Sequence, residues 1–146
     1  EKIWRRAGME ADAYWPLIKA GIEHGGGFVS ATLRDFARFG LFIAKGAGPA
    51  GAVLPPGWLD MARSSVFPAT DKGSGYGLGW WVRQDGAYEA MGAYGQSVTI
   101  YPDDNVIIAI NAASIDPSGF GLARWRILQA LDAAAVGRPD PNDKPD

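Results

Sequence analysis

The sequence predicts an α+β fold in which an antiparallel sheet is flanked by helices. Three observations favour this class. Apolar residues recur at three- and four-residue steps early in the chain, strand-like runs replace this period after Ser64, and a helical pattern returns near Gly119. Short connections separate the strand candidates, and such connections favour antiparallel pairing because parallel strands need long crossovers.

The best-defined element is an amphipathic helix that begins after Thr32 and ends near Lys45 and Gly46. Thr32 and Asp35 have the spacing of a capping box, in which each side chain satisfies a backbone N–H at the start of the helix. Asp35 stands where glutamate is usual, so the match is slightly weaker than the ideal motif.

Two shorter helical segments accompany this helix. Residues 2–7 form the first, and Gly8 is placed to end it. The second, GWLDMARS, follows a loop rich in Gly and Pro. We expect it to pack against the core through Trp58, Leu59 and Met61.

Four strand candidates follow, at residues 76–84, 87–92, 97–101 and 106–111. The dipeptide Asp85-Gly86 is a strong two-residue hairpin signal between the first two. The last candidate, VIIAIN, is an almost continuous apolar run, which is typical of a central strand.

A helix over residues 119–136 is expected to cover one face of the sheet. Its apolar side is predicted to carry Trp125, Leu128, Leu131 and Ala135. The following segment is rich in Pro and Asp, so residues 137–146 are predicted to form a disordered tail.

Composition restricts the classes of partner. The chain has 146 residues, of which 47% are hydrophobic. It is long enough to bury one core and too short for two ordinary domains. With 14 basic and 16 acidic residues the net charge is -2, so we expect no nucleic-acid partner. Cysteine is absent and there is one histidine, so we expect neither a metal nor a cofactor, and the cellular compartment stays open. No apolar run approaches the roughly 20 residues of a membrane span.

The chain shows no complete catalytic constellation of its own. No serine has a lysine three residues on, and none lies in Gly-x-Ser-x-Gly, to which residues 95–99 come nearest. The single His24 could polarise a substrate, or it could be incidental to its loop. Asp103-Asp104 is explained by a hairpin turn, where aspartate bonds to its own backbone.

Three segments, in their order, resemble the C-terminal part of serine β-lactamase-like hydrolases. They are GGGFVSATLRDFARFG, then GYGLGWWV, then GAYGQSVTIYPDDNVIIAIN with a helix after it. Within that superfamily the chain is most similar to the branch that contains 6-aminohexanoate-dimer hydrolase, class C β-lactamases and related esterases. The resemblance covers nearly the whole chain, from Ile3 to about Val136.

The resemblance implies an active site between a helical subdomain and an α/β subdomain. It also implies cleavage of an amide or ester through an acyl-enzyme, with a Ser-x-x-Lys nucleophile and a Tyr-x-Asn tyrosine. Neither motif occurs in the chain. We therefore expect residues 1–136 to be the C-terminal portion of a serine hydrolase domain, inactive alone. Its expected partners are the missing N-terminal part of the same fold and a small amide or ester substrate.

The family's Lys-Thr-Gly motif lines the cleft, and the residue after its glycine usually supplies an oxyanion-hole N–H. The matching place here is residues 90–92, with Ala93 as the candidate donor. Loss of the lysine disfavours recognition of a β-lactam carboxylate. The resemblance thus assigns Gly92, Ala93, Tyr94 and His24 to an oxyanion or substrate wall.

Other interpretations stay open at this stage. Gly92 and Gly95 fit a bulge or turn as well as a substrate wall. The glycines at 25–27 fit a flexible turn as well as a bend at the cleft. A different function class also remains, a non-catalytic binding or interaction module that uses exposed aromatics such as Tyr94 and one of Trp80 or Trp81. Those two tryptophans are adjacent on a strand candidate, so one is expected in the core.

Overall fold

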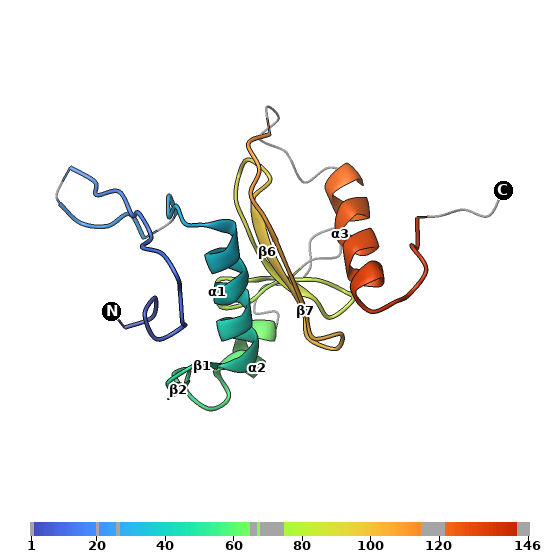
Figure 1. Cartoon of the computed structure of the whole chain (residues 1–146), viewed down its shortest axis with the longest axis horizontal. Coiled ribbons are helices and arrows are strands. Elements are labelled where there is room, and N and C mark those ends of the chain that lie inside the picture. Colours follow the sequence, from blue (N-terminus) through green and yellow to red (C-terminus); the bar gives the residue numbers. More distant parts are fainter. Residues whose placement is uncertain are drawn as a thin grey trace.

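The centre of the fold, in the part of the chain that the structure describes, is a five-stranded antiparallel sheet. The computed structural model describes residues 2–19, 21–25, 27–64, 67, 75–114 and 122–142. The strands lie across the sheet in chain order, as β3 (Gly75–Tyr76), β4 (Trp81–Val82), β5 (Tyr88–Met91), β6 (Ser97–Tyr101) and β7 (Val106–Ile110). Two helices, α1 (Leu33–Lys45) and α3 (Leu122–Ala135), cover opposite faces (Figure 1), which confirms the predicted class.

The first strand candidate forms two short strands instead of one. Gly79 adopts φ 84° between β3 and β4, and the Gly77 N–H donates to the Trp80 carbonyl at 2.8 Å. The glycines in this segment therefore make a turn. Trp80 is 5% exposed and Trp81 36%, so the prediction that one of the pair lies in the core is confirmed.

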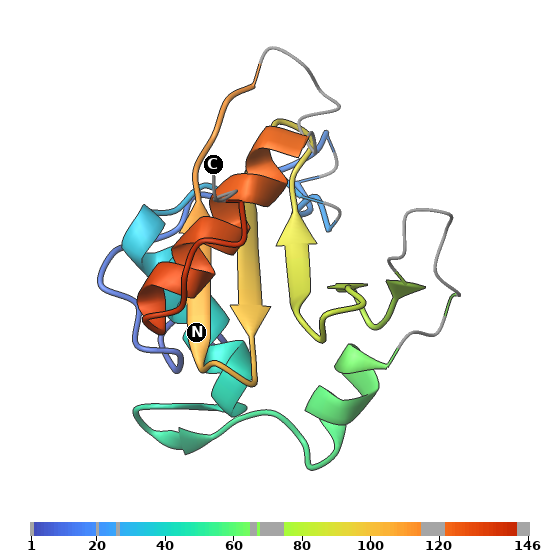
Figure 2. The ribbon, with the colours of Figure 1, turned by 90° about the vertical axis from the view of Figure 1, so that its right-hand side faces the viewer.

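The strand β7 lies at one edge of the described sheet, where the sequence predicted a central strand. Its side chains are apolar on both faces because α1 contacts one face and α3 the other (Figure 2). Gly40 lets α1 come close. A Cβ at that position would lie 2.6 Å from Cγ2 of Ile107 and 2.9 Å from Cγ1 of Val98. The apolar run therefore reflects cover by two helices rather than a central position in the sheet.

The helix α1 begins at the predicted cap. The Thr32 hydroxyl oxygen accepts the Asp35 N–H at 3.1 Å, and Gly46 ends the helix in the left-handed region at φ 64°. The Asp35 carboxylate binds outside the helix, since it accepts the N–H groups of Glu10 at 2.8 Å and Ala11 at 3.1 Å. It thus ties the N-terminal segment to the start of α1.

The predicted loop before the second short helix contains a small hairpin, β1 (Ala47–Gly48) and β2 (Gly51–Ala52), and the helix itself is α2 (Trp58–Arg63). Trp58 and Leu59 pack against the core as expected, but Met61 is 52% exposed and Ala62 is fully buried. The prediction for Met61 was wrong because it lies about 100° around the helix from Ala62, which centres the buried face.

The helix α3 buries a different side from the predicted one. Leu128 is fully buried against the sheet, whereas Leu131 is 47% exposed and Ala135 also faces solvent. Asp132, four residues after Leu128, lies on the buried side instead. The apolar pattern misled because α3 carries apolar side chains around most of its circumference. Residues 119–121 of the predicted helix lie outside the described residues.

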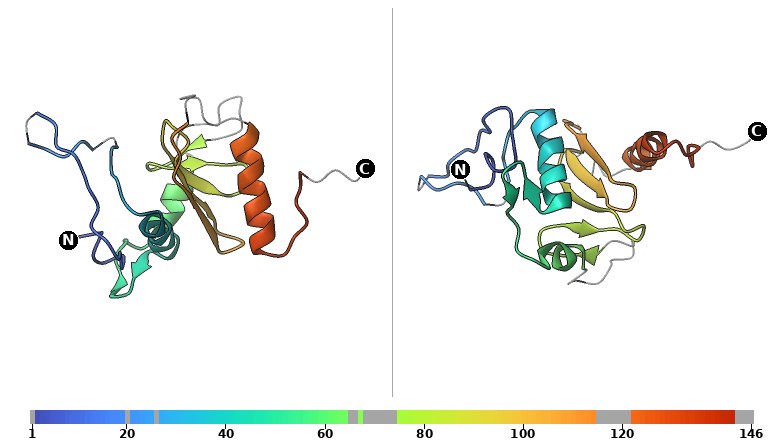
Figure 3. Two further views of the ribbon diagram at one scale, coloured as in Figure 1. Left: turned by 45° about the horizontal axis from the view of Figure 1, so that its top comes forward. Right: turned by 60° about the horizontal axis from the view of Figure 1, so that its bottom comes forward.

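The described residues 9–19, 21–25 and 27–31 extend away from the sheet as an irregular arm (Figures 1 and 3). Tyr14 and Ser30 join its two sides, because each donates its N–H to the carbonyl of the other at 2.8 Å. Several of its large apolar side chains are exposed, among them Tyr14 and Phe28. We refer below to these described residues as the arm.

The described residues after α3 contact the helix and the β6–β7 turn. Arg138 donates to the carboxylates of Asp104 at 2.6 Å and Asp132 at 2.8 Å. The predicted disordered tail stays a prediction, and its residues 143–146 lie outside the described part. No helix in the described part of the chain is long and apolar enough to cross a bilayer.

Candidate functional site

A groove of about 910 Å³ runs between the arm, the start of α1 and the hairpin that joins β5 to β6. Tyr14 and Phe28 line it from the arm, and Phe36 lines it from α1. The hairpin supplies residues 90–94 together with Gln96, and the chain after β7 supplies Asn111. Segments that are distant in sequence therefore form one wall.

The β5–β6 connection is a three-residue loop, Ala93, Tyr94 and Gly95. Its closing pair is Gly92 and Gln96, in which the Gly92 N–H donates to the Gln96 carbonyl at 2.8 Å. Gly95 adopts φ 90° and donates its N–H to the Gly92 carbonyl at 3.2 Å. A positive φ at the last loop residue is typical of three-residue hairpins, so the turn interpretation of Gly95 is confirmed.

The Ala93 N–H differs from its neighbours in the loop. Ala93 is exposed, and within the residues that the structure describes its N–H forms no hydrogen bond. The Tyr94 N–H donates to Oε1 of Gln96 at 3.0 Å, and the Gly95 N–H is bonded as described. A backbone donor on a groove wall with no protein acceptor is available to a ligand.

A side chain at Gly92 would collide with the present position of the Gln96 side chain. A Cβ there would lie 2.5 Å from Oε1 and 3.1 Å from Cδ of Gln96. Side-chain contacts that close are not tolerated without movement of the amide. The position of the Gln96 side chain within the hairpin therefore accounts for glycine at position 92.

The groove brings together three of the four residues assigned to the wall by resemblance, namely Gly92, Ala93 and Tyr94. His24 is not among the described residues that line it. The His24 ring instead packs edge-on against Phe28, which does line the groove, with ring centres 4.9 Å apart. A role for His24 stays a prediction.

The part of the groove wall that the structure describes carries no Asp, Glu, Lys, Arg or His. Its polar side chains are uncharged and include Ser30, Gln96 and Asn111. Burying a carboxylate without a cationic partner costs desolvation energy that nothing on this wall would offset. This wall therefore suits a neutral group, and it supplies no strong general base.

Asp35 holds the base of the arm beside the groove. The hydrogen bond from the Glu10 N–H, followed by those from Ala11 and Thr32 and the charge of Arg38, lowers the pKa of Asp35 below its ordinary value against the opposing effect of burial. The ionised carboxylate is thus the form that the folded chain favours.

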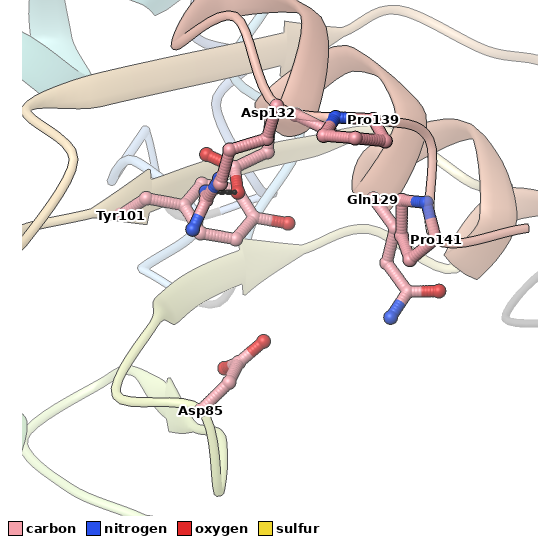
Figure 4. A pocket seen from close by; sticks show the side chains of 8 residues that line it. Asp85, Tyr101, Gln129, Asp132, Pro139 and Pro141 are labelled. Atoms are coloured by element: carbon pink, nitrogen blue, oxygen red, sulfur yellow. Dashed lines mark hydrogen bonds and ion pairs between the residues drawn. The ribbon is translucent and has the colours of Figure 1, made fainter.

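A smaller cavity of about 220 Å³ lies between α3, β6 and the turn after β4 (Figure 4). Tyr101, Asp132 and Asp85 line it, and burial raises the pKa of both Tyr101 and Asp132. Beside it the Arg83 guanidinium lies 4.0 Å from the ring centre of Trp125 and 5.3 Å from that of Tyr101. Among the described residues no group of three or more potential ligands could hold a metal. We assign this cluster to the packing of α3.

Sequence reasoning missed Gln96 and the arm residues Tyr14 and Phe28. The spacing Gly92-x-x-Gly95-Gln96 is a local signal for the closed loop and could have drawn attention to Gln96. No local pattern brings the arm to the hairpin, because that contact depends on the tertiary fold.

An antiparallel sheet between two helices, with a groove at a glycine-containing hairpin, is the arrangement expected of a β-lactamase-like hydrolase. Residues 2–132 match the family described as Beta-lactamase, and the chain belongs to this family. A curated relative, 6-aminohexanoate-dimer hydrolase of Paenarthrobacter ureafaciens, is 28% identical over 140 residues. A solved structure from Bacillus anthracis, described as a candidate 6-aminohexanoate-dimer hydrolase, superposes with a TM-score of 0.81 at 25% identity.

These matches are partial for the relatives. The alignment covers 88% of this chain and 35% of the curated relative, and the superposition covers 94% of this chain and 38% of the solved one. The chain therefore spans little more than a third of the length of either relative. The predicted family resemblance and fold are confirmed.

Proposed function

We propose that this chain forms the oxyanion-side wall of the active site in a serine hydrolase that cleaves a neutral amide or ester through an acyl-enzyme. The observation that carries the proposal is that Ala93 is exposed on the groove wall and that its N–H has no acceptor within the described residues. Such a donor stabilises the oxyanion of a tetrahedral intermediate, and loss of one costs about 10²–10³ in kcat. Membership of the β-lactamase family supports this chemistry.

The nucleophile, in this proposal, belongs to polypeptide outside the chain. Neither Ser-x-x-Lys nor Tyr-x-Asn occurs among the 146 residues. Two serines line the groove, Ser30 and Ser97, but its described wall offers neither of them a lysine or histidine as base. The rest of the same protein, which would carry both motifs, is the chain's proposed partner.

The proposed substrate is neutral at the group that this wall contacts. The wall combines Tyr14, Phe28 and Tyr94 with uncharged polar side chains, which suits an apolar acyl or leaving group. The names of the relatives agree with amide chemistry, since both refer to hydrolysis of a 6-aminohexanoate dimer.

Hydrolysis of p-nitrophenyl acetate and labelling by a fluorophosphonate test the proposal. We expect the hydrolase that contains this chain to turn over the ester and to be labelled at a serine outside residues 1–146, as located by peptide mass spectrometry. The 146-residue chain alone should show neither reaction. Labelling of a serine within the chain, or turnover by the chain alone that one serine substitution abolishes, would overturn the assignment of the nucleophile.

A second candidate function is a non-catalytic binding module. It is favoured by the exposure of Tyr14, Phe28 and Tyr94, which are 71%, 70% and 52% exposed along one groove. Tryptophan fluorescence discriminates the two, because Trp15 lies next to Tyr14 and is itself 46% exposed. Saturable quenching by oligosaccharides or peptides, lost in Tyr94→Ala and without any esterase activity, would favour binding over catalysis.

A further inference from the structure

Gln96 closes the hairpin loop at two points. Its backbone carbonyl accepts the Gly92 N–H at 2.8 Å, and its side-chain Oε1 accepts the Tyr94 N–H at 3.0 Å. A backbone N–H can be satisfied only by the oxygen of a side-chain amide, so this contact fixes which end of the Gln96 amide faces the loop. We call this pair of bonds the Gln96 clamp.

The clamp depends on Gly92. A Cβ on Gly92 would lie 2.5 Å from Oε1, 3.1 Å from Cδ and 3.3 Å from Cβ of Gln96. A side chain at position 92 therefore requires the Gln96 amide to move, and we expect this movement to weaken its bond to the Tyr94 N–H. Gly92 and Gln96 act as one structural unit.

The clamp also determines which donor of the loop is left over. The loop has three N–H groups, of which Gly95 donates to the Gly92 carbonyl and Tyr94 donates to Gln96. Of these three N–H groups, only that of Ala93 has no acceptor within the described residues. Without Oε1 the Tyr94 N–H would lose its acceptor, and two adjacent amides would then be unpaired.

We infer that Gln96 is a positioning residue for hydrolysis. It accepts the Tyr94 N–H and holds the loop so that the Ala93 N–H is the donor available to the groove. The inference rests on the proposed function and adds the side chain that sets the geometry of its donor. Gln96 acts through the loop and is assigned no contact with the reacting atoms.

The near-isosteric variant Gln96→Met, made in the hydrolase that contains this chain, removes the acceptor and keeps the bulk. Because a misplacement of about 1 Å costs up to about 10²-fold in rate, we expect kcat for p-nitrophenyl acetate to fall about 10- to 100-fold. We expect KM to stay within about twofold, since the lost interaction forms in the transition state. Hydrogen exchange of the Tyr94 amide should become faster.

Three further variants complete the experiment. Gln96→Glu keeps an oxygen at the clamp and should retain the slow exchange of the Tyr94 amide. Gly92→Ala displaces the Gln96 amide from the other side and should reproduce both effects of Gln96→Met, including the loss of kcat. Gln84→Met changes an exposed glutamine in the β4–β5 turn and should keep the wild-type kcat.

The outcomes separate the inference from the proposed function. If Gln96→Met or Gly92→Ala speeds exchange at Tyr94 while kcat stays at the wild-type level, the positioning role is wrong. Unchanged exchange in both variants would show that the clamp does not hold the loop, and it would overturn the inference as well. If the wild-type hydrolase shows neither turnover nor fluorophosphonate labelling, the proposed function fails, and the exchange data still decide whether the clamp exists.

Discussion

The carboxylate of Asp35 accepts the backbone N–H of Glu10 at 2.8 Å, and this bond joins the arm to the helix that flanks the groove. The same carboxylate accepts the Ala11 N–H and the Thr32 hydroxyl, at 3.1 and 3.0 Å. Phe36, the next residue along α1, lines the groove. One buried acidic side chain therefore joins the start of the arm to α1, beside the ion pair between Glu10 and Arg38.

Acid should weaken this attachment. The Glu10 N–H chiefly lowers the pKa of Asp35, so the ionised carboxylate contributes stability that is fully present above the unfolded-state pKa of about 3.9. That contribution is lost as the pH falls through the lower pKa of the folded state. The urea midpoint of Asp35→Asn should therefore lie below that of the wild type at pH 7, and the difference should shrink in acid.

The matched control for this prediction is Asp12→Asn, because Asp12 is exposed on the same segment. Its urea midpoint should follow the wild type across the pH range. A difference between wild type and Asp35→Asn that stays constant from neutral to strongly acidic pH would show that the ionised carboxylate does not hold the arm.

Packing of α1 on the sheet predicts a large effect at Gly40. A methyl group at this position would meet Ile107 at 2.6 Å and Val98 at 2.9 Å. Overpacking of about 1–3 kcal/mol opposes a helix-propensity gain of about 1 kcal/mol, and two β-branched neighbours put the cost at the upper end. We expect Gly40→Ala to lower the free energy of unfolding by about 2 kcal/mol, as measured by urea denaturation.

Gly25→Ala is the control for Gly40→Ala, because a Cβ on Gly25 would meet nothing within 4 Å. This variant should stay within about 0.5 kcal/mol of the wild type. The double variant Gly40→Ala/Val98→Ala should lose less free energy of unfolding than the sum of the losses in the two single variants, because the smaller side chain makes room for the new methyl group. Simple additivity of the two would contradict the proposed contact.

The unit formed by Gly92 and Gln96 predicts non-additive kinetics. Gly92→Ala and Gln96→Met each release the Tyr94 N–H, so the double variant should lose little more activity than either single one. Comparison of kcat for p-nitrophenyl acetate across the four proteins of the cycle measures this coupling. Two independent factors that multiply in the double variant would mean that the residues act separately.

Apolar side chains on the outer side of α3 predict self-association of the isolated chain. Ile127 and Leu131 are one helical turn apart and are 53% and 47% exposed. Exposed apolar surface of this kind favours association. Sedimentation velocity should show species larger than the monomer at high concentration, and Leu131→Glu should reduce them. Met61→Glu, at a similarly exposed residue on α2, is the control, and a clean monomer for the wild-type chain would contradict the prediction.

Local signals predicted much of the fold. The Thr32 cap occurs where the sequence indicated it. The hairpin at Asp85-Gly86 also forms, but its loop has three residues, 84–86, instead of the predicted two, because the Arg83 N–H donates to the Ala87 carbonyl at 2.9 Å. Such features depend on neighbours a few residues apart. The buried side of α3 was predicted wrongly, because several sides of this helix are apolar and packing against the sheet decides which of them is buried.

The candidate site was only partly accessible from sequence. Ala93 was assigned by resemblance, whereas its lack of an acceptor follows from the bonds that Tyr94 and Gly95 make. The contribution of the arm could not be predicted, since the Asp35 carboxylate attaches it by accepting the backbone N–H of Glu10, and every residue type except proline offers such a donor.

Removal of the Ala93 N–H tests the central claim most directly. Ala93→Pro lacks this donor, and an early turn position tolerates proline, whereas the control Ala93→Gly keeps the donor. In the proposed hydrolase that would contain this chain, we predict that kcat for p-nitrophenyl acetate falls about 10²–10³-fold in Ala93→Pro and stays near wild type in Ala93→Gly. A folded Ala93→Pro enzyme with wild-type kcat would contradict the account.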